Sequence, residues 1–272
     1  MRRRRQDVRA SPVRRSEPSG RAAGIDPRGR SPDFGARAAE YDRIRPVDEN
    51  WWRVYDVVVR EADLRGRRVI DIGCGTGRLS RALAERESAR VWGVDATPEM
   101  LEQARARVPR GVGLKLGGAE ELPFRDAWFE RAVMWLVVHL VDRPRAFAEA
   151  RRVLDADGRF AVVSFDASHF DAYWLNPYFP SLEPLDRGRF PTREELERDL
   201  AAAGFGAVRS MRISQPATLA REEALMRIRE GHISTFDLLP PEEVAAGRAR
   251  AERELPERVE YALEWLIAVA SA

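Results

Sequence analysis

The chain has 272 residues, 44% hydrophobic and 33% charged, which is typical of a folded globular protein and excludes collagen-like, coiled-coil and wholly disordered classes. The formal net charge of +2 hides an asymmetry, because residues 1–45 carry 13 arginines against 6 acidic residues. Cys74 is the single cysteine, which excludes an intrachain disulfide and a metal site built on paired thiolates, and we predict no metal. No apolar run reaches the roughly 20 residues of a membrane span, and no secretory signal is apparent. We therefore expect a cytoplasmic protein.

Residues 1–33 are rich in Arg, Ser, Pro and Gly and contain few apolar residues. This composition predicts a disordered basic arm, followed by one domain over residues 34–272. An arginine-rich arm could also bind nucleic acid through its charge. We favour the solvated arm, so nucleic acid is not the expected partner.

From Phe34 onwards, apolar residues recur at helix and strand spacings. The segment 166–190 is aromatic and broken by prolines, which predicts an ordered loop over a pocket. Because helices alternate with strands elsewhere, we predict an α/β fold with a mostly parallel sheet covered on both faces. Helices are expected over Phe34–Ile44, Glu49–Ala62, Arg78–Glu87, Pro98–Val108, Arg143–Leu154, 192–203, 221–230 and 241–255. Strands are expected over Val69–Ile72, Arg90–Val94, Gly113–Leu116, Phe129–Val133, Arg159–Phe165, 207–214 and 259–269.

A glycine cluster follows the first expected strand. Gly73, Gly75 and Gly77 lie between this strand and the helix beginning at Arg78. Glycines allow a tight turn in which the backbone can approach a ligand without hindrance from a Cβ atom. The spacing is D-x-G-x-G-x-G, which differs from the dinucleotide-binding G-x-G-x-x-G because Arg78 stands at the third glycine position. No P-loop G-K-[ST] occurs.

Asp95 stands at the end of the second expected strand, about 20 residues beyond the glycine cluster. A carboxylate at this place can accept two hydrogen bonds from the vicinal hydroxyls of a ribose. The alternative interpretation is an N-cap for the helix at Pro98, for which Thr97 is better placed.

These motifs resemble the class I S-adenosylmethionine (SAM)-dependent methyltransferases, in particular the small-molecule branch of ubiquinone and menaquinone biosynthesis methyltransferases. The resemblance covers about residues 34–270. It is carried by Val69-Ile-Asp-Ile-Gly-Cys-Gly-Thr-Gly-Arg-Leu, Val94-Asp-Ala-Thr-Pro-Glu-Met-Leu and Gly117-Gly-Ala-Glu-Glu-Leu-Pro-Phe. It implies a Rossmann-like fold whose seven-stranded, mostly parallel sheet has its last strand antiparallel. The chain departs from the family at Gly118, where an acidic residue is usual.

The resemblance implies SAM as the cofactor and a role for each matching residue. Asp71 would brace the loop or bind the methionine end of SAM, Asp95 would bind the ribose, and Met100 would pack on the adenine. Met134 would face the methionine moiety. The complete set of implied cofactor-binding residues is Tyr41, Asp71, Gly73, Cys74, Gly75, Gly77, Asp95, Ala96, Met100, Gly118, Ala119, Glu120 and Met134. We interpret Cys74 as a small apolar residue that fills space beside the cofactor, and not as a nucleophile.

The implied activity is methyl transfer to a small acceptor through an O, N or C nucleophile, with an acceptor that is partly apolar or aromatic. Transfer from a sulfonium depends mainly on in-line positioning in a closed site, because the leaving group is neutral. His139 is the candidate general base, and a structural histidine is the alternative. His169 and His232 have weaker claims. Aromatic residues that could line the acceptor pocket are Tyr41, Trp51, Trp52, Tyr173 and Trp174.

Acceptor specificity is expected in the segments with the fewest motifs: an N-terminal helical lid over residues 34–64 and insertions over 166–190 and 215–256. A non-catalytic SAM-binding protein and an RNA methyltransferase anchored by the basic arm remain as alternatives. A nicotinamide-dependent oxidoreductase does not fit the glycine spacing. The exposed helices could support a homodimer.

Overall fold

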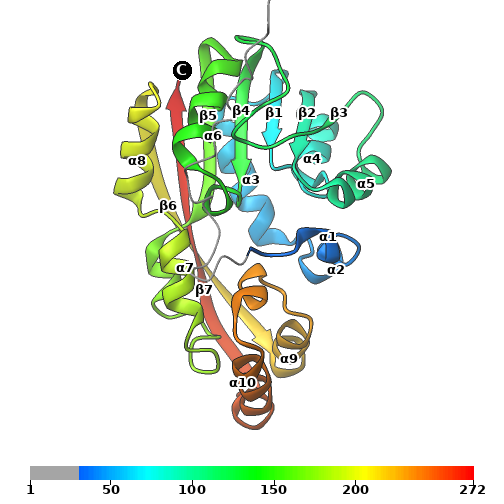
Figure 1. Ribbon diagram of the computed structural model, residues 1–272, viewed down its shortest axis with the longest axis vertical. Helices are drawn as coiled ribbons and strands as arrows, with labels where there is room; N and C mark the ends of the chain where they lie inside the picture. Colours follow the sequence, from blue (N-terminus) through cyan, green and yellow to red (C-terminus); the bar gives the residue numbers. More distant parts are fainter. Residues whose placement is uncertain (1–30) are drawn as a thin grey trace, which may run out of the picture.

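The computed structural model describes residues 31–272, so the predicted arm over residues 1–33 lies almost entirely outside the described part. A seven-stranded sheet in the order β3-β2-β1-β4-β5-β7-β6 forms its centre (Figure 1). The strands are β1 (Arg68–Ile72), β2 (Arg90–Asp95), β3 (Gly113–Leu116), β4 (Phe129–Trp135), β5 (Leu154–Phe165), β6 (Gly206–Ala220) and β7 (Arg258–Ser271).

The first five strands are parallel, and β7 is inserted antiparallel between β5 and β6. In register, Ile72 lies between Val94 of β2 and Met134 of β4, so the carboxyl ends of the three central strands lie at one edge. This arrangement confirms the predicted α/β fold with an antiparallel last strand. It also brings the glycine cluster and Asp95 to the same edge, where open α/β sheets bind ligands.

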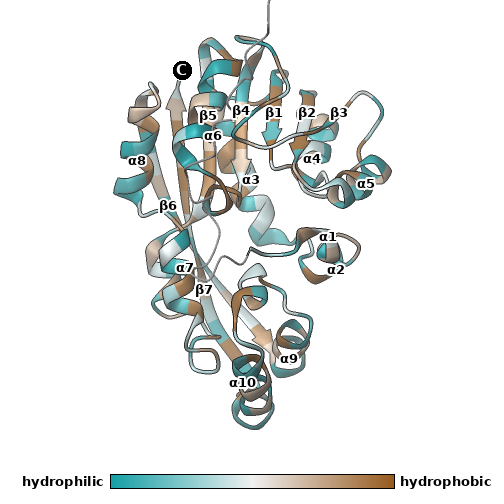
Figure 2. Ribbon diagram, in the orientation of Figure 1, coloured by the Kyte–Doolittle hydropathy of each residue, from teal (hydrophilic) through white to brown (hydrophobic). Residues whose placement is uncertain are grey.

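Helices cover both faces of the sheet. On one face, α3 (Glu49–Ala62) and α4 (Arg78–Arg86) pack apolar residues such as Val58 and Leu83 on the strands. On the other face, α6 (Arg143–Val153) and α8 (Arg193–Ala202) do so through residues such as Phe147 and Leu196. α5 (Pro98–Arg107) lies beside β3. Figure 2 shows brown in central strands such as β2 and β4, and teal on the outer sides of helices such as α5 and α8.

Strands β6 and β7 continue beyond the other strands as a long antiparallel pair (Figure 1). Their far ends carry α7 (Leu182–Arg189), α9 (Arg221–Arg229) and α10 (Pro241–Glu254), which share a hydrophobic core of their own. Two 3₁₀ helices, η2 (Ala167–Phe170) and η3 (Ser234–Leu238), complete this unit. We call residues 166–190 and 221–257 the cap.

The structure corrects three expected elements. The expected helix over Phe34–Ile44 is two short helices, α1 (Phe34–Arg37) and α2 (Tyr41–Ile44). The expected loop over 166–190 contains helix α7, in which Pro184 lies in the first turn, where backbone N–H groups have no partner inside the helix. The strand expected over 207–214 extends to Ala220 through Pro216, which an edge strand tolerates. The insertion expected from residue 215 therefore begins as strand.

Among residues 31–272, no helix is long and apolar enough to cross a bilayer. The same residues contain no group of three or more side chains arranged to hold a metal ion.

Candidate active site

The glycine loop joins β1 to α4 and turns through left-handed backbone conformations. Gly73, Gly75 and Gly77 have φ values of +73°, +53° and +80°, which residues with a Cβ atom rarely adopt. The backbone N–H groups of Gly73 and Cys74 both donate to the carbonyl of Val94, at 2.7 and 2.9 Å. The loop is thereby attached to the end of β2. A Cβ atom on Gly73 would lie 2.4 Å from Cγ2 of Val137, so this position requires glycine for space as well.

Asp95 connects the glycine loop to the next helix. Its Oδ2 accepts a hydrogen bond from the Gly75 N–H at 2.8 Å, and its Oδ1 accepts one from the Thr97 N–H at 2.9 Å. Thr97 is the N-cap residue of α5, but its side chain makes no capping bond. Each carboxylate oxygen retains a further lone pair, so Asp95 can still accept hydrogen bonds from a ligand.

A cavity of about 270 Å³ lies beside Asp95, and we call it the loop cavity. Its wall includes the segment after β3 and the start of α5. Several predicted cofactor residues share this wall: Tyr41, Gly73, Gly75, Asp95, Ala96, Met100, Gly118, Ala119 and Glu120.

The carboxyl group of Asp71 is buried on the other side of the loop. Its Oδ2 accepts a hydrogen bond from Ser80 Oγ at 2.6 Å, so it braces the glycine loop against α4. Burial raises the pKa of Asp71 to about 7, and the charge of Asp95 acts in the same direction. Burial likewise raises the pKa of the Cys74 thiol, which disfavours the thiolate and agrees with its interpretation as a filler.

Helix α2 is fastened to the glycine loop through Asp42. The carboxylate of Asp42 accepts hydrogen bonds from Thr76 Oγ1 at 2.7 Å and Arg78 Nη2 at 3.1 Å. It also forms an ion pair with Arg107 of α5 at 3.1 Å. Tyr41, the preceding residue, thereby lies at the wall of both cavities.

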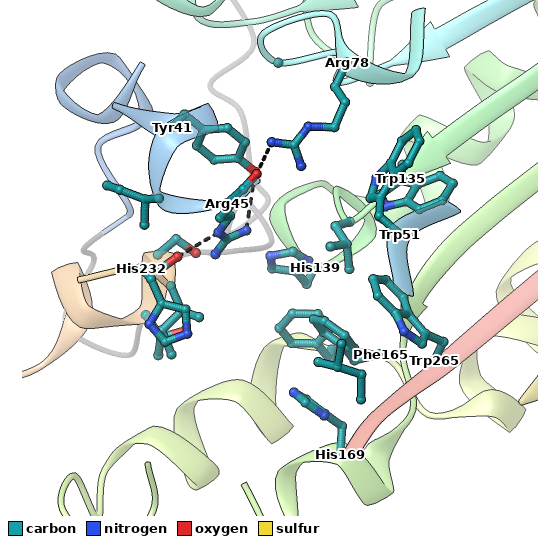
Figure 3. A pocket seen from close by; sticks show the side chains of 18 of the residues that line it. Tyr41, Arg45, Trp51, Arg78, Trp135, His139, Phe165, His169, His232 and Trp265 are labelled. Atoms are coloured by element: carbon teal, nitrogen blue, oxygen red, sulfur yellow. Dashed lines mark hydrogen bonds between the residues drawn. The ribbon is translucent and has the colours of Figure 1, made fainter. Parts of the chain in front are cut away.

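A second cavity of about 270 Å³, which we call the cap cavity, lies between the glycine loop and the cap. The two cavities share wall residues, among them Tyr41, Gly73 and Trp135. The ring of Trp135 stacks on Trp51 at 5.2 Å between centroids, and Phe165 lies 4.7 Å from Trp265 (Figure 3). The side of the cap cavity nearest the sheet is therefore aromatic.

Three histidines line the cap cavity, and burial lowers the pKa of each. His139 lies on η1 (Val138–Leu140) and its ring stacks on Phe190 at 3.9 Å. The charges of Arg189 and Arg45 further hold its pKa well below the usual range, so its imidazole is neutral at pH 7. The pKa of His169 is lowered to about 4. His232 is held by the Tyr173 hydroxyl, 3.2 Å from its Nε2, which indicates a structural role.

The structure places most of the predicted cofactor residues at one or both of the two cavities. Gly77 and Met134 line neither cavity, since Met134 belongs to the buried core under α6. Trp135 takes the place expected for Met134, because successive strand residues point to opposite faces. Of the expected aromatic residues, Trp52 packs under the guanidinium of Arg86 and Trp174 in the cap core, away from the cavity. Tyr41, Trp51 and Tyr173 line the cap cavity.

Sequence reasoning missed several wall residues of the cap cavity. Trp135 could have been predicted from the alternation of side chains along β4, because the glycine loop after Asp71 already indicated where the site lies. Other wall residues come from segments far apart in the sequence and were not singled out as site residues: Arg45, Phe165, Asp186, Arg189, Phe190, Arg227, Tyr261 and Trp265.

The fold and the glycine loop are shared with known methyltransferases. A family model described as a methyltransferase domain matches residues 69–158. A malonyl-[acyl-carrier protein] O-methyltransferase of Geobacter sulfurreducens is 36% identical over 186 residues, which is 64% of this chain and 69% of that protein. A ubiquinone/menaquinone biosynthesis C-methyltransferase of Geobacter sp. is 32% identical over 208 residues, covering 65% and 87%.

A solved structure, a methyltransferase from an antibiotic biosynthesis pathway of Anabaena variabilis, superposes with a TM-score of 0.68 at 23% identity, covering 84% of this chain and 99% of that one. This likeness supports the fold. Together with the sequence relatives, it defines a Rossmann-like methyltransferase. The chain belongs to the class I SAM-dependent methyltransferase family and resembles its ubiquinone and menaquinone biosynthesis members. It is a methyltransferase, and SAM is its cofactor.

Proposed function

We propose that the enzyme transfers a methyl group from SAM in the loop cavity to a small, partly apolar or aromatic acceptor in the cap cavity. The observation that carries this proposal is the contact between the two cavities at Gly73, Tyr41 and Trp135. One sequence relative is named as a ubiquinone/menaquinone biosynthesis C-methyltransferase, and this name also favours an apolar or aromatic acceptor.

The loop cavity fits the adenosine part of SAM. Gly75 lines both cavities, and a Cβ atom built there would meet nothing within 4 Å, so the missing side chain leaves room for a ligand. We assign Asp95 to the ribose hydroxyls, because its carboxylate faces the cavity and has acceptor capacity left. Met100 and Ala96 would contact the adenosine from α5 and the end of β2.

Glu120 can replace the acidic residue that the family usually has at position 118. Its Oε1 accepts a hydrogen bond from the Asp142 N–H at 2.9 Å. Its Oε2 lies 3.2 Å from the place of a Cβ atom on Gly118. The second carboxylate oxygen therefore occupies the space of the missing side chain, and we assign it to the amino group of the adenine.

SAM supplies an electrophilic methyl group on a sulfonium. The contribution of the chain is to hold the acceptor against the aromatic side of the cap cavity and to exclude water. Neutral His139 can accept a hydrogen bond from an acceptor hydroxyl, although its low pKa makes it a weak base. We therefore assign His139 first to orienting the acceptor. Helices α1 and α2, held by Asp42, would act as the lid.

Calorimetric titration with SAM and with its demethylated product, S-adenosylhomocysteine (SAH), tests the cofactor site, with NADH as a control. We expect micromolar binding of SAM or SAH and none of NADH. Transfer of labelled methyl groups to a panel of phenols, quinols and aromatic acids then tests the activity. SAM binding without transfer to any acceptor would instead favour a non-catalytic SAM-binding protein. Transfer to RNA that is lost on removal of residues 1–30 would favour the RNA alternative.

A further inference from the structure

The wall of the cap cavity is rich in arginine. Arg45, Arg78, Arg189 and Arg227 all line it. Two of them are paired with carboxylates, since Arg78 lies 3.1 Å from Asp42 and Arg227 bonds to Glu223. Arg189 is paired with Asp186 through one nitrogen, and Arg45 has no carboxylate partner among residues 31–272.

Arg189 is a buried guanidinium with unused donors. Its side chain is 5% exposed, and its Nη2 donates to Asp186 Oδ1 at 2.8 Å and to Thr235 Oγ1 at 2.9 Å. Its Nε and Nη1 are buried and have no hydrogen-bond partner among residues 31–272. Buried guanidinium N–H groups are nearly always paired, because leaving them unpaired loses the hydrogen bonds they made to water. Within the described chain, two donors of Arg189 are thus unsatisfied, in a residue that lines the cap cavity.

Arg45 adds a second positive charge. Its Nε donates to the carbonyl of His232 at 2.7 Å and its Nη1 to the Tyr41 hydroxyl at 3.3 Å (Figure 3). These partners are neutral, and Arg45 forms no ion pair with a carboxylate in the described part of the chain. Arg45 and Arg189 both lower the pKa of His139, so the fields of both guanidiniums meet at the same imidazole.

Three carboxyl groups, those of Asp48, Asp71 and Asp186, stand in the wall of the cap cavity and compensate part of this charge. Asp186 is paired with Arg189, and the same oxygen, Oδ1, also accepts from Thr235 Oγ1 at 2.7 Å. The carboxyl of Asp71 is bonded to Ser80 and has a pKa of about 7, so it carries only part of a negative charge near neutral pH. The region where Arg45 and Arg189 approach His139 thus contains one guanidinium without a carboxylate partner among the described residues, that of Arg45, and the opposite side of the cavity is aromatic.

We propose that the methyl acceptor carries a carboxylate, bound by Arg189 with Arg45 beside it, next to an apolar ring that lies on Trp135, Phe165 and Trp265. A planar carboxylate matches the donor geometry of a guanidinium and neutralises its charge. The substrate class is therefore an aromatic or similarly apolar carboxylic acid. This inference rests on the proposed function, because it concerns the acceptor half of the same site.

The test compares two probes of the same ring, 2-naphthoate and the neutral 2-naphthalenemethanol. Both are titrated by calorimetry into the full chain saturated with SAH. The naphthoate is expected to bind about tenfold more tightly or better, which is the discrimination expected of one charge-assisted contact. Equal binding of the two probes, or no binding of the naphthoate at millimolar concentration, would overturn the proposal.

Variants assign the discrimination to Arg189. Arg189→Met should lower the affinity for naphthoate to that for the alcohol and leave the alcohol unaffected. Arg187→Met is the matched control on the same helix, since its side chain is 38% exposed and lies outside the cavity wall. Because Arg189→Met leaves Asp186 buried without its cation, Asp186→Asn/Arg189→Met removes both charges and provides a variant whose folding is less at risk. Unchanged discrimination in the double variant contradicts the proposal.

SAH binding, measured in each variant, separates the two levels of inference. If SAH binds and naphthoate is not preferred, the carboxylate proposal fails and the methyltransferase site stands. If SAH does not bind the folded wild-type chain, the proposed cofactor site itself fails.

Discussion

The two cavities are built in different ways. The loop cavity is formed by short segments that follow β1, β2 and β3, and its contacts join residues that stand close to strand ends, such as Gly75 and Asp95. The cap cavity is closed by contacts between distant segments, such as Arg45 with His232 and Asp186 with Thr235. The loop cavity can therefore be recognised from local sequence motifs, whereas the cap cavity depends on how the long β6–β7 pair places the cap. Cofactor binding and acceptor binding should therefore respond to different substitutions.

Asp71 provides the largest expected effect and lies at the wall of the cap cavity while bracing the loop. Its folded pKa of about 7 exceeds the ordinary value of 3.8, so the folded state keeps a proton that the unfolded state loses. The stability contributed by this proton is fully present below pH 3.8 and is lost as the pH rises to 7, by up to about 4 kcal/mol. Asp71→Asn does not titrate, so its stability relative to the wild type should increase over this window.

Urea unfolding of both proteins between pH 4 and pH 8 measures this difference. Asp126→Asn is the control, because the side chain of Asp126 is 77% exposed and its difference from wild type should stay flat. Parallel stability curves for Asp71→Asn and wild type would mean that the buried carboxyl titrates normally. Asp71 would then be a carboxylate when it accepts the hydrogen bond from Ser80 at neutral pH.

Asp95→Ala tests the separation of the two cavities directly. The substitution removes a charged hydrogen-bond acceptor that contributes about 1.5–3 kcal/mol of binding free energy. The Kd for SAH should therefore rise roughly a hundredfold. The counterpart in the cap cavity is Phe190→Leu, which removes the ring stacked on His139 and should leave the Kd for SAH unchanged. Both are measured by calorimetry. A similar loss in the two variants would show that the cap takes part in cofactor binding.

The sequence predicted the sheet and its flanking helices because apolar residues recur there at the spacings of strands and helices that pack against a core. It failed where context decides. Pro184 indicated a loop, but its place in the first turn of α7 removes the penalty. The strand expected over 207–214 continues through Pro216 to Ala220, because β6 is an edge strand. In both cases the missing information was the position of the proline relative to its hydrogen-bond partners.

The loop side of the site was predictable for the same reason, since a strand, a glycine turn and a strand-end carboxylate are adjacent in sequence. Met134 was assigned to the cavity one residue away from Trp135, which lines it. The alternation of side chains in β4 contained this information. Arg189 carries no local signal, because only the folded cap brings it to the pocket with Asp186 and Thr235. Acceptor recognition was therefore beyond sequence patterns.

Gly73 and Gly75 offer a sharper comparison within the glycine loop. Both have positive φ, but only Gly73 has a neighbour in the way, with Cγ2 of Val137 at 2.4 Å from a built Cβ. Gly75→Ala should cost about 1 kcal/mol of stability from backbone strain, and Gly73→Ala about 2 kcal/mol more from overpacking. Thermal and urea unfolding measure this difference.

SAH affinity completes the comparison of the two glycines. In Gly75→Ala the new methyl group enters the cavities, so affinity should fall although the fold is little disturbed. Val137→Ala should restore part of the stability lost in Gly73→Ala, because it removes the obstructing atoms. Equal destabilisation by the two alanines would indicate that Val137 yields without cost.

The smallest expected effect concerns Glu120, which we propose takes the place of the acidic residue that is usual in the family at position 118. Glu120→Gln keeps an acceptor for the Asp142 N–H and removes the charge, so SAH affinity should fall about tenfold, or about 1.4 kcal/mol. The S-inosyl analogue of SAH, whose ring has a carbonyl in place of the amino group, should bind wild type and variant equally.

Gly118→Asp should then change the SAH affinity in opposite directions in the wild type and in Glu120→Gln. In the wild type, the new carboxylate would lie beside Oε2 of Glu120, 3.2 Å from the built Cβ, and repulsion should weaken SAH binding. In Glu120→Gln, the same substitution restores a carboxylate at the usual family position and should strengthen binding. Calorimetry of the four proteins measures the coupling between the two positions. If Glu120 does not contact the adenine amino group, Glu120→Gln by itself should leave the SAH affinity unchanged.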